Sequence, residues 1–234
     1  MKNREGDIRA LLGRGGKQLA AIEEEYGRSL RAKSVSADLK IAIKELCENL
    51  RSVLDYLAHD IRGKYCLGTK PNAKFYFPIL PSGQVYESRM EEWFPGLRES
   101  ASALWDYLES IQPYHGGQAK WLGVFNDVNN ENKHSALVEQ TRTEMERIHV
   151  TREGLGGVSW DPSSVRFGPG VRVLGTPIDP STQMPVSDPT LQIKRVIWVD
   201  FQFAGTGASA LGLLRQATEG VAAIAQKVMC ELAR

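Results

Sequence analysis

Polar and ionisable side chains recur at helical spacing in one short stretch near residue 55. Arg51, Asp55 and His59 follow one another at intervals of four residues, which places them one turn apart on nearly the same helix face. A carboxylate beside a histidine raises the pKa of the imidazole and fixes its tautomer, as a general base requires. Ser52 adds a hydroxyl one turn from Asp55. An ion-pair ladder on a helix face would show the same spacing, so both interpretations stay open.

A second polar stretch covers residues 129–134. Asn130 and His134 are four residues apart, as are Asn129 and Lys133, so the members of each pair would lie one helical turn apart. Amides, an ammonium group and an imidazole within two turns could bind a phosphate or a carboxylate. The same groups could equally form a polar network that holds two helices in register. The sequence therefore predicts either a ligand site or a structural network here.

Metal binding is a third interpretation of these stretches. Asp55 with His59, and Asn130 with His134, resemble half-sites of a metal centre in a helical bundle. Such centres use several carboxylates and a Glu-x-x-His pattern, whereas these two pairs supply one carboxylate. We therefore assign no metal ligand and expect no cofactor.

The composition is that of an ordinary globular protein. The chain has 234 residues, 42% of them hydrophobic, and a formal net charge of +1. The total charge thus gives no reason to expect nucleic acid or an anionic membrane as a partner. No run of about 18 apolar residues occurs, so we expect no transmembrane helix. Three widely spaced cysteines do not indicate a disulfide framework, and they fit a cytoplasmic protein.

Helical periodicity of apolar residues dominates the first 142 positions. It predicts long helices over residues 34–66 and 118–141, which carry the two polar stretches. It also predicts a helix over residues 17–30. The Gly-Arg-Gly-Gly sequence at 13–16 precedes this helix and predicts a flexible joint.

The period changes from helical to alternating beyond about residue 144. Alternation predicts a strand over 196–203, and prolines predict a loop over 177–190. Shorter strands are predicted over residues 148–150, 158–160, 165–167 and 171–174. The Gly-Thr-Gly turn at 205–207 leads into a last helix over about 208–232, and a turn of this kind can hold an anion at the helix N-terminus.

This order of elements predicts an α+β protein. We expect an N-terminal antiparallel helical bundle over residues 1–142 and a small antiparallel β-sheet over residues 143–205. The helix within residues 206–234 should pack back on the bundle, so that the chain forms one domain overall.

Four motifs in one order resemble those of a family of uncharacterised bacterial proteins. They are Asn-Leu-Arg-Ser-Val-Leu-Asp-Tyr-Leu-Ala at 49–58, Phe-Pro-Ile at 77–79, Ile-Gln-Pro-Tyr at 111–114 and Asn-Asn-Glu-Asn-Lys-His at 129–134. The resemblance covers roughly residues 45–140. It implies a shared fold but brings no established activity with it.

Three positions differ from that family pattern. Tyr56 stands where the pattern has a second histidine, Asn132 where it has an aspartate, and Ser135 where it has an arginine. All three replaced residues are ionisable. The differences therefore favour a role for the polar stretches that is not catalytic.

Arg51 and His59 on one helix of a bundle also resemble, more distantly, the HEPN-domain ribonucleases, although the spacing here is longer than in their motif. This resemblance implies RNA binding or metal-independent RNA cleavage, as in phage defence or toxin proteins. Arg51 would hold phosphate, and His59 or His134 would serve as acid or base. It also implies a homodimer, with the site at its interface.

Three functions are therefore open, and whether the chain is an enzyme is not decided. The favoured one is a non-catalytic binding or interaction protein with RNA or another protein as partner. The alternatives are an HEPN-like RNA-binding or RNA-cleaving protein and a metal-dependent hydrolase. Candidate catalytic residues are Arg51, Asp55, His59 and His134, and candidate binding residues are Ser52, Asn129, Asn130 and Lys133.

Overall fold

The computed structural model describes most of the chain, namely residues 4–32, 35–66, 74–134, 140–203 and 206–234. For residues 30–32, 132–134, 140–145 and 195–199 it describes the backbone alone.

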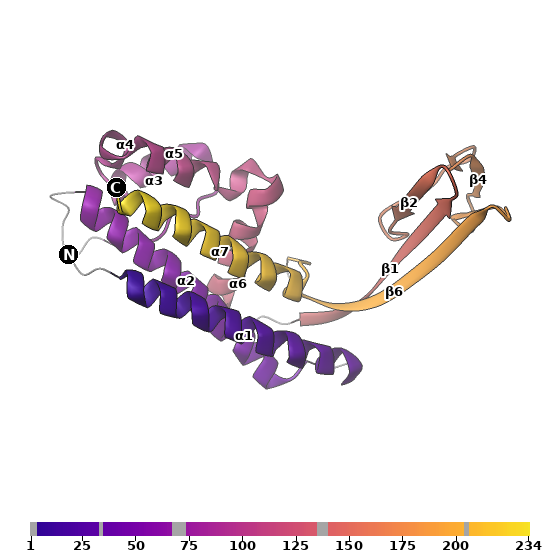
Figure 1. Ribbon diagram of the computed structural model, residues 1–234, viewed down its shortest axis with the longest axis horizontal. Helices are drawn as coiled ribbons and strands as arrows, with labels where there is room; N and C mark the ends of the chain where they lie inside the picture. The colour runs from indigo at the N-terminus through magenta and orange to yellow at the C-terminus, as the bar shows by residue number, and fades with distance from the viewer. Residues whose placement is uncertain (1–3, 33–34, 67–73, 135–139, 204–205) are drawn as a thin grey trace. The chain divides into compact units, whose positions relative to one another are not determined.

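The chain divides into two compact units (Figure 1). The helical unit comprises residues 1–141 and 201–234, and the β unit comprises residues 142–200. Helices pack together in the helical unit, whereas the β unit is built from antiparallel strands in two small three-stranded sheets. The α+β class predicted from the sequence is therefore confirmed.

Three long helices lie side by side in the helical unit, α1 (Glu5–Ala32), α2 (Ala37–Tyr65) and α7 (Ala210–Leu232) (Figure 1). Ser36 caps α2, because its hydroxyl accepts a hydrogen bond from the Leu39 amide at 3.1 Å. The apolar stripe predicted for this helix is buried against its neighbours. The last helix packs on α1 and α2, as the sequence predicts.

Two side chains at the end of α2 bind the end of α7. Lys64 Nζ donates to the Leu232 carbonyl at 2.7 Å, and the Tyr65 hydroxyl donates to the Glu231 carbonyl at 2.9 Å. Carbonyls in the last turn of a helix have no partner within that helix, so these bonds complete the C-terminus of α7.

Shorter elements cover the rest of the helical unit. They are α3 (Gly83–Trp93), α4 (Leu97–Ser100), α5 (Ser102–Ser110), the 3-10 turns η1 (Pro113–His115) and η2 (Gly117–Ala119), and α6 (Lys120–His134). The backbone leaves helical geometry at Ala101, which separates α4 from α5. Helix α6 packs against both α2 and α7.

The flexible joint predicted at residues 13–16 is wrong, because α1 runs through these glycines without a break. A Cβ placed on Gly15 would lie 3.5 Å from a methyl group of Leu50. Packing against α2 thus stabilises the helical backbone where the local sequence favours a turn. Asn49 adds to this contact by donating to the Leu11 carbonyl at 3.1 Å.

The β unit contains two sheets. The first has the order β2-β1-β6, formed by β1 (Gln140–Arg152), β2 (Gly156–Trp160) and β6 (Leu191–Phe203). The register of its antiparallel β1–β2 hairpin places Ile148 opposite Trp160. The second has the order β3-β4-β5, formed by β3 (Arg172–Val173), β4 (Thr176–Asp179) and β5 (Met184–Pro185).

Two predictions for this unit are wrong. Residues 165–167 form no strand, and the predicted loop at 177–190 contains most of β4 and all of β5. Pro185 ends β5, an edge strand of its sheet, where a residue without an amide hydrogen is tolerated. Pro185 is therefore compatible with β5, whereas Pro177 lies in β4, the middle strand of this sheet.

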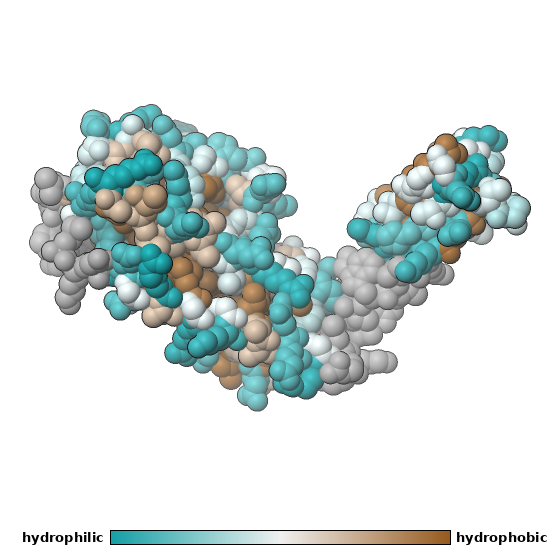
Figure 2. All heavy atoms as spheres, in the orientation of Figure 1, coloured by the Kyte–Doolittle hydropathy of each residue, from teal (hydrophilic) through white to brown (hydrophobic). Residues whose placement is uncertain are grey.

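On the face seen in Figure 2, hydrophilic and hydrophobic residues are intermixed over the surface of the helical unit. None of the described helices is both long enough and apolar enough to cross a membrane.

Candidate functional site

The Arg51 and Asp55 side chains form a two-point ion pair on α2. Arg51 Nη2 lies 3.0 Å from Asp55 Oδ1, and Arg51 Nε lies 3.2 Å from Asp55 Oδ2. The Arg51 side chain is 9% exposed and that of Asp55 31%. Two parallel N–H···O bonds fix the planar guanidinium against the carboxylate. The spacing of four residues in the sequence indicates this pair correctly.

The ion pair reaches two segments far away in the sequence. Arg51 Nη1 donates to Asn126 Oδ1 on α6 at 3.1 Å, and Arg51 Nη2 donates to the Phe77 carbonyl at 3.4 Å. The Phe77 amide in turn donates to Asp55 Oδ1 at 3.1 Å. We call these four groups, Arg51, Asp55, Asn126 and the Phe77 backbone, the α2–α6 lock. It joins α2, α6 and the extended segment 74–80.

Ser52 and His59 take no part in this lock. The Ser52 hydroxyl donates to the Glu48 carbonyl at 2.8 Å, within its own helix. The His59 ring packs edge-on against Phe75, with 4.6 Å between ring centroids. In the described part of the chain, no hydrogen bond joins His59 to Asp55.

The pKa of His59 lies below its ordinary value. Partial burial disfavours the imidazolium, and the nearby Arg4 guanidinium disfavours it further. Asp55 and Asp60 act in the opposite direction but do not reverse the shift. A neutral imidazole is therefore favoured here, without the carboxylate orientation that the spacing predicts.

The second polar stretch lies on the last turns of α6, and its residues have different environments. Asn129 is fully buried and Asn130 is exposed. The side chains of Lys133 and His134 lie outside the described residues. Asn126, which the sequence analysis misses, is the residue of α6 that contacts Arg51. It lies one turn before Asn129, so the run of amides could have indicated it.

Asn129 has a buried side-chain amide. Neither its Oδ1 nor its Nδ2 atom contacts a donor or acceptor within the described part of the chain. A buried polar group without a partner costs free energy, because the hydrogen bonds to water in the unfolded chain are not replaced.

Replacing Asn129 by leucine should therefore raise the free energy of unfolding by about 1–2 kcal/mol. Thermal unfolding would show this as a rise in Tm of about 2–8 °C for a chain of this size. Asn130→Leu is the matched control on the exposed side of the same turn and should change stability by less than about 0.5 kcal/mol. A lower Tm for Asn129→Leu would show that the amide has a partner in solution.

Gln112, in the Ile-Gln-Pro-Tyr motif, is a second buried polar residue. Its side chain is fully buried, and Oε1 accepts from the Leu80 amide at 2.9 Å. Its Nε2 donates to the Pro78 carbonyl at 3.0 Å and to the Leu108 carbonyl at 2.7 Å. Gln112 thus holds the end of segment 74–80 at Pro78 and Leu80, next to the Phe77 backbone that the α2–α6 lock binds. The Phe-Pro-Ile and Gln-Pro-Tyr motifs are parts of one contact.

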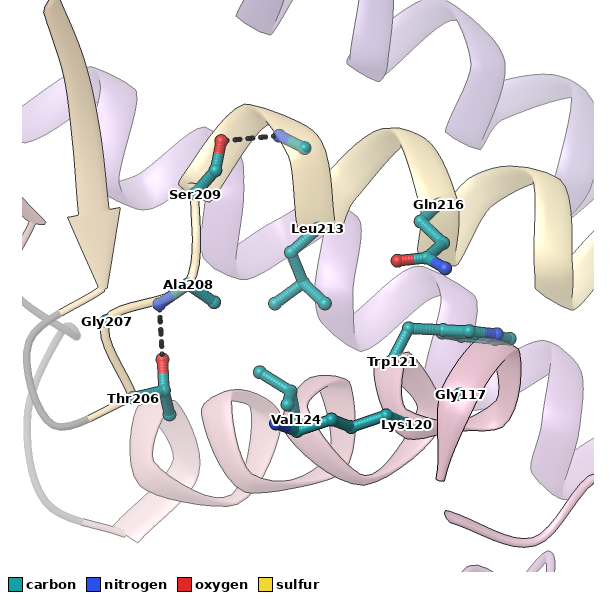
Figure 3. A pocket seen from close by; sticks show the side chains of 11 residues that line it. Gly117, Lys120, Trp121, Val124, Thr206, Gly207, Ala208, Ser209, Leu213 and Gln216 are labelled. Carbon is teal, nitrogen blue, oxygen red and sulfur yellow. Dashed lines mark hydrogen bonds between the residues drawn. The ribbon is translucent and has the colours of Figure 1, made fainter. Parts of the chain in front are cut away.

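A cavity of about 560 Å³ lies between α6 and α7 in the helical unit (Figure 3). We call it the α6–α7 cavity. Its wall on α6 includes Lys120, Trp121 and Val124, and its wall on α7 includes Leu213 and Gln216. The turn before α7 closes one side, and the cavity residues there are Thr206, Gly207, Ala208 and Ser209.

Trp121 is held in place by close approach to a glycine of α7. A Cβ on Gly220 would lie only 2.2 Å from Trp121 Cζ2, so no larger residue fits without moving the indole. The indole also lines a second cavity of about 310 Å³, with Tyr107 and Ile224. Trp121 therefore contributes to two cavities, and the second is lined mainly by residues of α5, η2 and α7.

Among the described residues, no three His, Cys, Asp or Glu side chains are grouped so that they could hold a metal ion.

Comparison with known proteins yields no match: no family model fits the chain, and no curated protein or solved structure is significantly similar to it. The fold and the site together define an α+β protein whose helical unit has an internal polar lock and a separate cavity.

Proposed function

We propose that this chain is a non-catalytic binding protein and that the α2–α6 lock is part of its architecture. The observation that carries the proposal is the engagement of Arg51. Its guanidinium is nearly buried and donates to Asp55, Asn126 and the Phe77 carbonyl. A phosphate-binding arginine would need donors directed toward a ligand.

The surroundings of Asp55 and His59 support the same proposal. Asp55 Oδ1 accepts from Arg51 and from the Phe77 amide, so this carboxylate is engaged in fixing the backbone. His59 packs on Phe75, and no carboxylate of the described residues makes a hydrogen bond with its ring. General acid–base catalysis needs a positioned group with its proton donor or acceptor in reach. The α6–α7 cavity is large enough to hold a ligand.

An RNA-cleavage assay tests the proposal against the ribonuclease alternative. Labelled single-stranded RNA would be incubated with the wild-type protein and with His59→Ala and His134→Ala. His115→Ala is the matched control, because His115 is an exposed histidine bound to Glu109 at 2.9 Å. We expect the same background rate from all four proteins. Cleavage by the wild type that is lost in His59→Ala or His134→Ala, and kept in His115→Ala, would overturn the proposal.

A further inference from the structure

We infer that the α6–α7 cavity binds a small molecule that combines an apolar ring with an anionic group. This inference rests on the proposed binding function and names its site and ligand class. It depends on three properties of the cavity: its volume, its apolar side chains and the positive charge of its lining.

The volume of the α6–α7 cavity is that of a small-molecule site. Ligand sites in proteins typically measure about 300–1,000 Å³, and this cavity measures about 560 Å³. It lies wholly within the helical unit, between two of its helices. A compact ring system of one or two rings with a short substituent would fit this space.

Apolar side chains from both helices face the interior of the cavity. Val124 of α6 and Leu213 of α7 point toward each other, and the Trp121 indole lies beside them (Figure 3). An indole offers a flat surface on which a ring can stack. Contact with Gly220 fixes this surface, so a ligand would not have to order it on binding.

Four polar side chains line the cavity, those of Lys120, Thr206, Ser209 and Gln216. Lys120 supplies an ammonium group that makes no ion pair within the described part of the chain. The Thr206 hydroxyl accepts from the Ala208 amide at 3.3 Å, and the Ser209 hydroxyl accepts from the Gly212 amide at 3.1 Å. Each hydroxyl therefore keeps its own proton to donate.

No carboxylate is found among the 11 residues that line the cavity. Its lining thus carries one positive charge and no negative one, although the chain as a whole is almost neutral. A carboxylate, sulfonate or phosphate on the ligand would pair with the Lys120 ammonium. This asymmetry favours an anion over a neutral or cationic ligand.

Two fluorescent probes of similar shape separate the contribution of charge from that of apolar contact. They are 1-anilinonaphthalene-8-sulfonate, which is anionic, and N-phenyl-1-naphthylamine, which is neutral. Lys120→Gln should weaken binding of the sulfonate roughly 5- to 10-fold, as expected for loss of one charge contact at a partly exposed site. Binding of the neutral probe should stay within about twofold, because its ring contacts are unchanged.

Two further variants complete the design. Gln216→Trp places a large ring at an exposed position of α7 on the cavity wall, and it should weaken both probes more than about tenfold by filling the space. Lys17→Gln removes an exposed lysine of α1 that does not line the cavity, and it should leave the affinity for both probes unchanged. Circular dichroism and Tm would establish that each variant is folded.

Absence of saturable binding by either probe would overturn the inference, as would sulfonate binding that is insensitive to both Lys120→Gln and Gln216→Trp. Neither result would bear on the proposed function, because the RNA-cleavage assay tests that function independently. Conversely, RNA cleavage that depends on His59 would overturn the proposed function even if the probes bind as expected.

Discussion

Replacing Asp55 by alanine should lower the free energy of unfolding by about 3 kcal/mol. The change leaves the Arg51 guanidinium nearly buried without its carboxylate, and it removes the acceptor of the Phe77 amide. Removing one partner of a buried ion pair lowers the free energy of unfolding by about 3–5 kcal/mol. Because Asp55 is partly exposed, we expect a loss at the lower end of this range. Urea denaturation followed by circular dichroism would measure it.

The chain offers a matched control for this experiment on the same helix. Lys44 and Glu48 form another pair four residues apart on α2, 3.5 Å between Nζ and Oε1, with side chains 34% and 39% exposed. Glu48→Ala should therefore cost less than about 0.5 kcal/mol, as is usual for exposed pairs. Equal losses for Asp55→Ala and Glu48→Ala would contradict the structural role of the lock.

Replacing Gln112 by alanine should have an effect of similar size, about 3 kcal/mol. The variant removes an acceptor from the Leu80 amide and a donor from the Pro78 and Leu108 carbonyls, all in a buried environment. It also leaves an empty space where the side chain lies. Chemical denaturation would record the loss, and faster amide exchange at Leu80 would locate it.

Two other variants make this prediction specific. Gln84→Ala, at an exposed position of α3, should change stability by less than about 0.5 kcal/mol. Gln112→Leu keeps most of the volume but none of the hydrogen bonds, so it should be nearly as unstable as Gln112→Ala. If Gln112→Leu is as stable as the wild type, its hydrogen bonds do not hold segment 74–80.

The sequence predicts local features of the lock but not its distant partners. Arg51 and Asp55 are one helical turn apart, so their spacing alone indicates the ion pair. Asn126 lies 75 residues from Arg51, and the Phe77 amide lies 22 residues from Asp55. Those contacts depend on how helices and segments pack in three dimensions, which residue spacing along one helix does not determine.

The predicted pairing of His59 with Asp55 also shows that spacing along one helix does not determine which side chains bind each other. Spacing places the two residues on one helix face, but Asp55 is engaged by Arg51 and Phe77, and His59 by Phe75. Competing tertiary partners therefore decide which of two local pairs forms.

Long helices were predictable because many apolar positions repeat along them, as in α2 and α7. The Gly-Arg-Gly-Gly sequence is helical because α2 packs on it, a contact between different helices. Strand β5 has two residues, too few for alternation to be visible, whereas β3 lies within the strand predicted over residues 171–174. The α6–α7 cavity joins residues near 120 to residues near 210, and the sequence indicated only the Gly-Thr-Gly turn at 205–207, as a turn of the kind that can hold an anion.

A double-mutant cycle between Arg51 and Asp55 tests the central claim most directly. Stabilities of the wild type, Arg51→Ala, Asp55→Ala and the double variant give the coupling free energy between the two side chains. We predict a favourable coupling of at least about 1.5 kcal/mol, the range of hydrogen bonds to charged groups inside proteins. A coupling below about 0.5 kcal/mol, as for an exposed surface pair, would contradict the account of Arg51 and Asp55 as a structural lock.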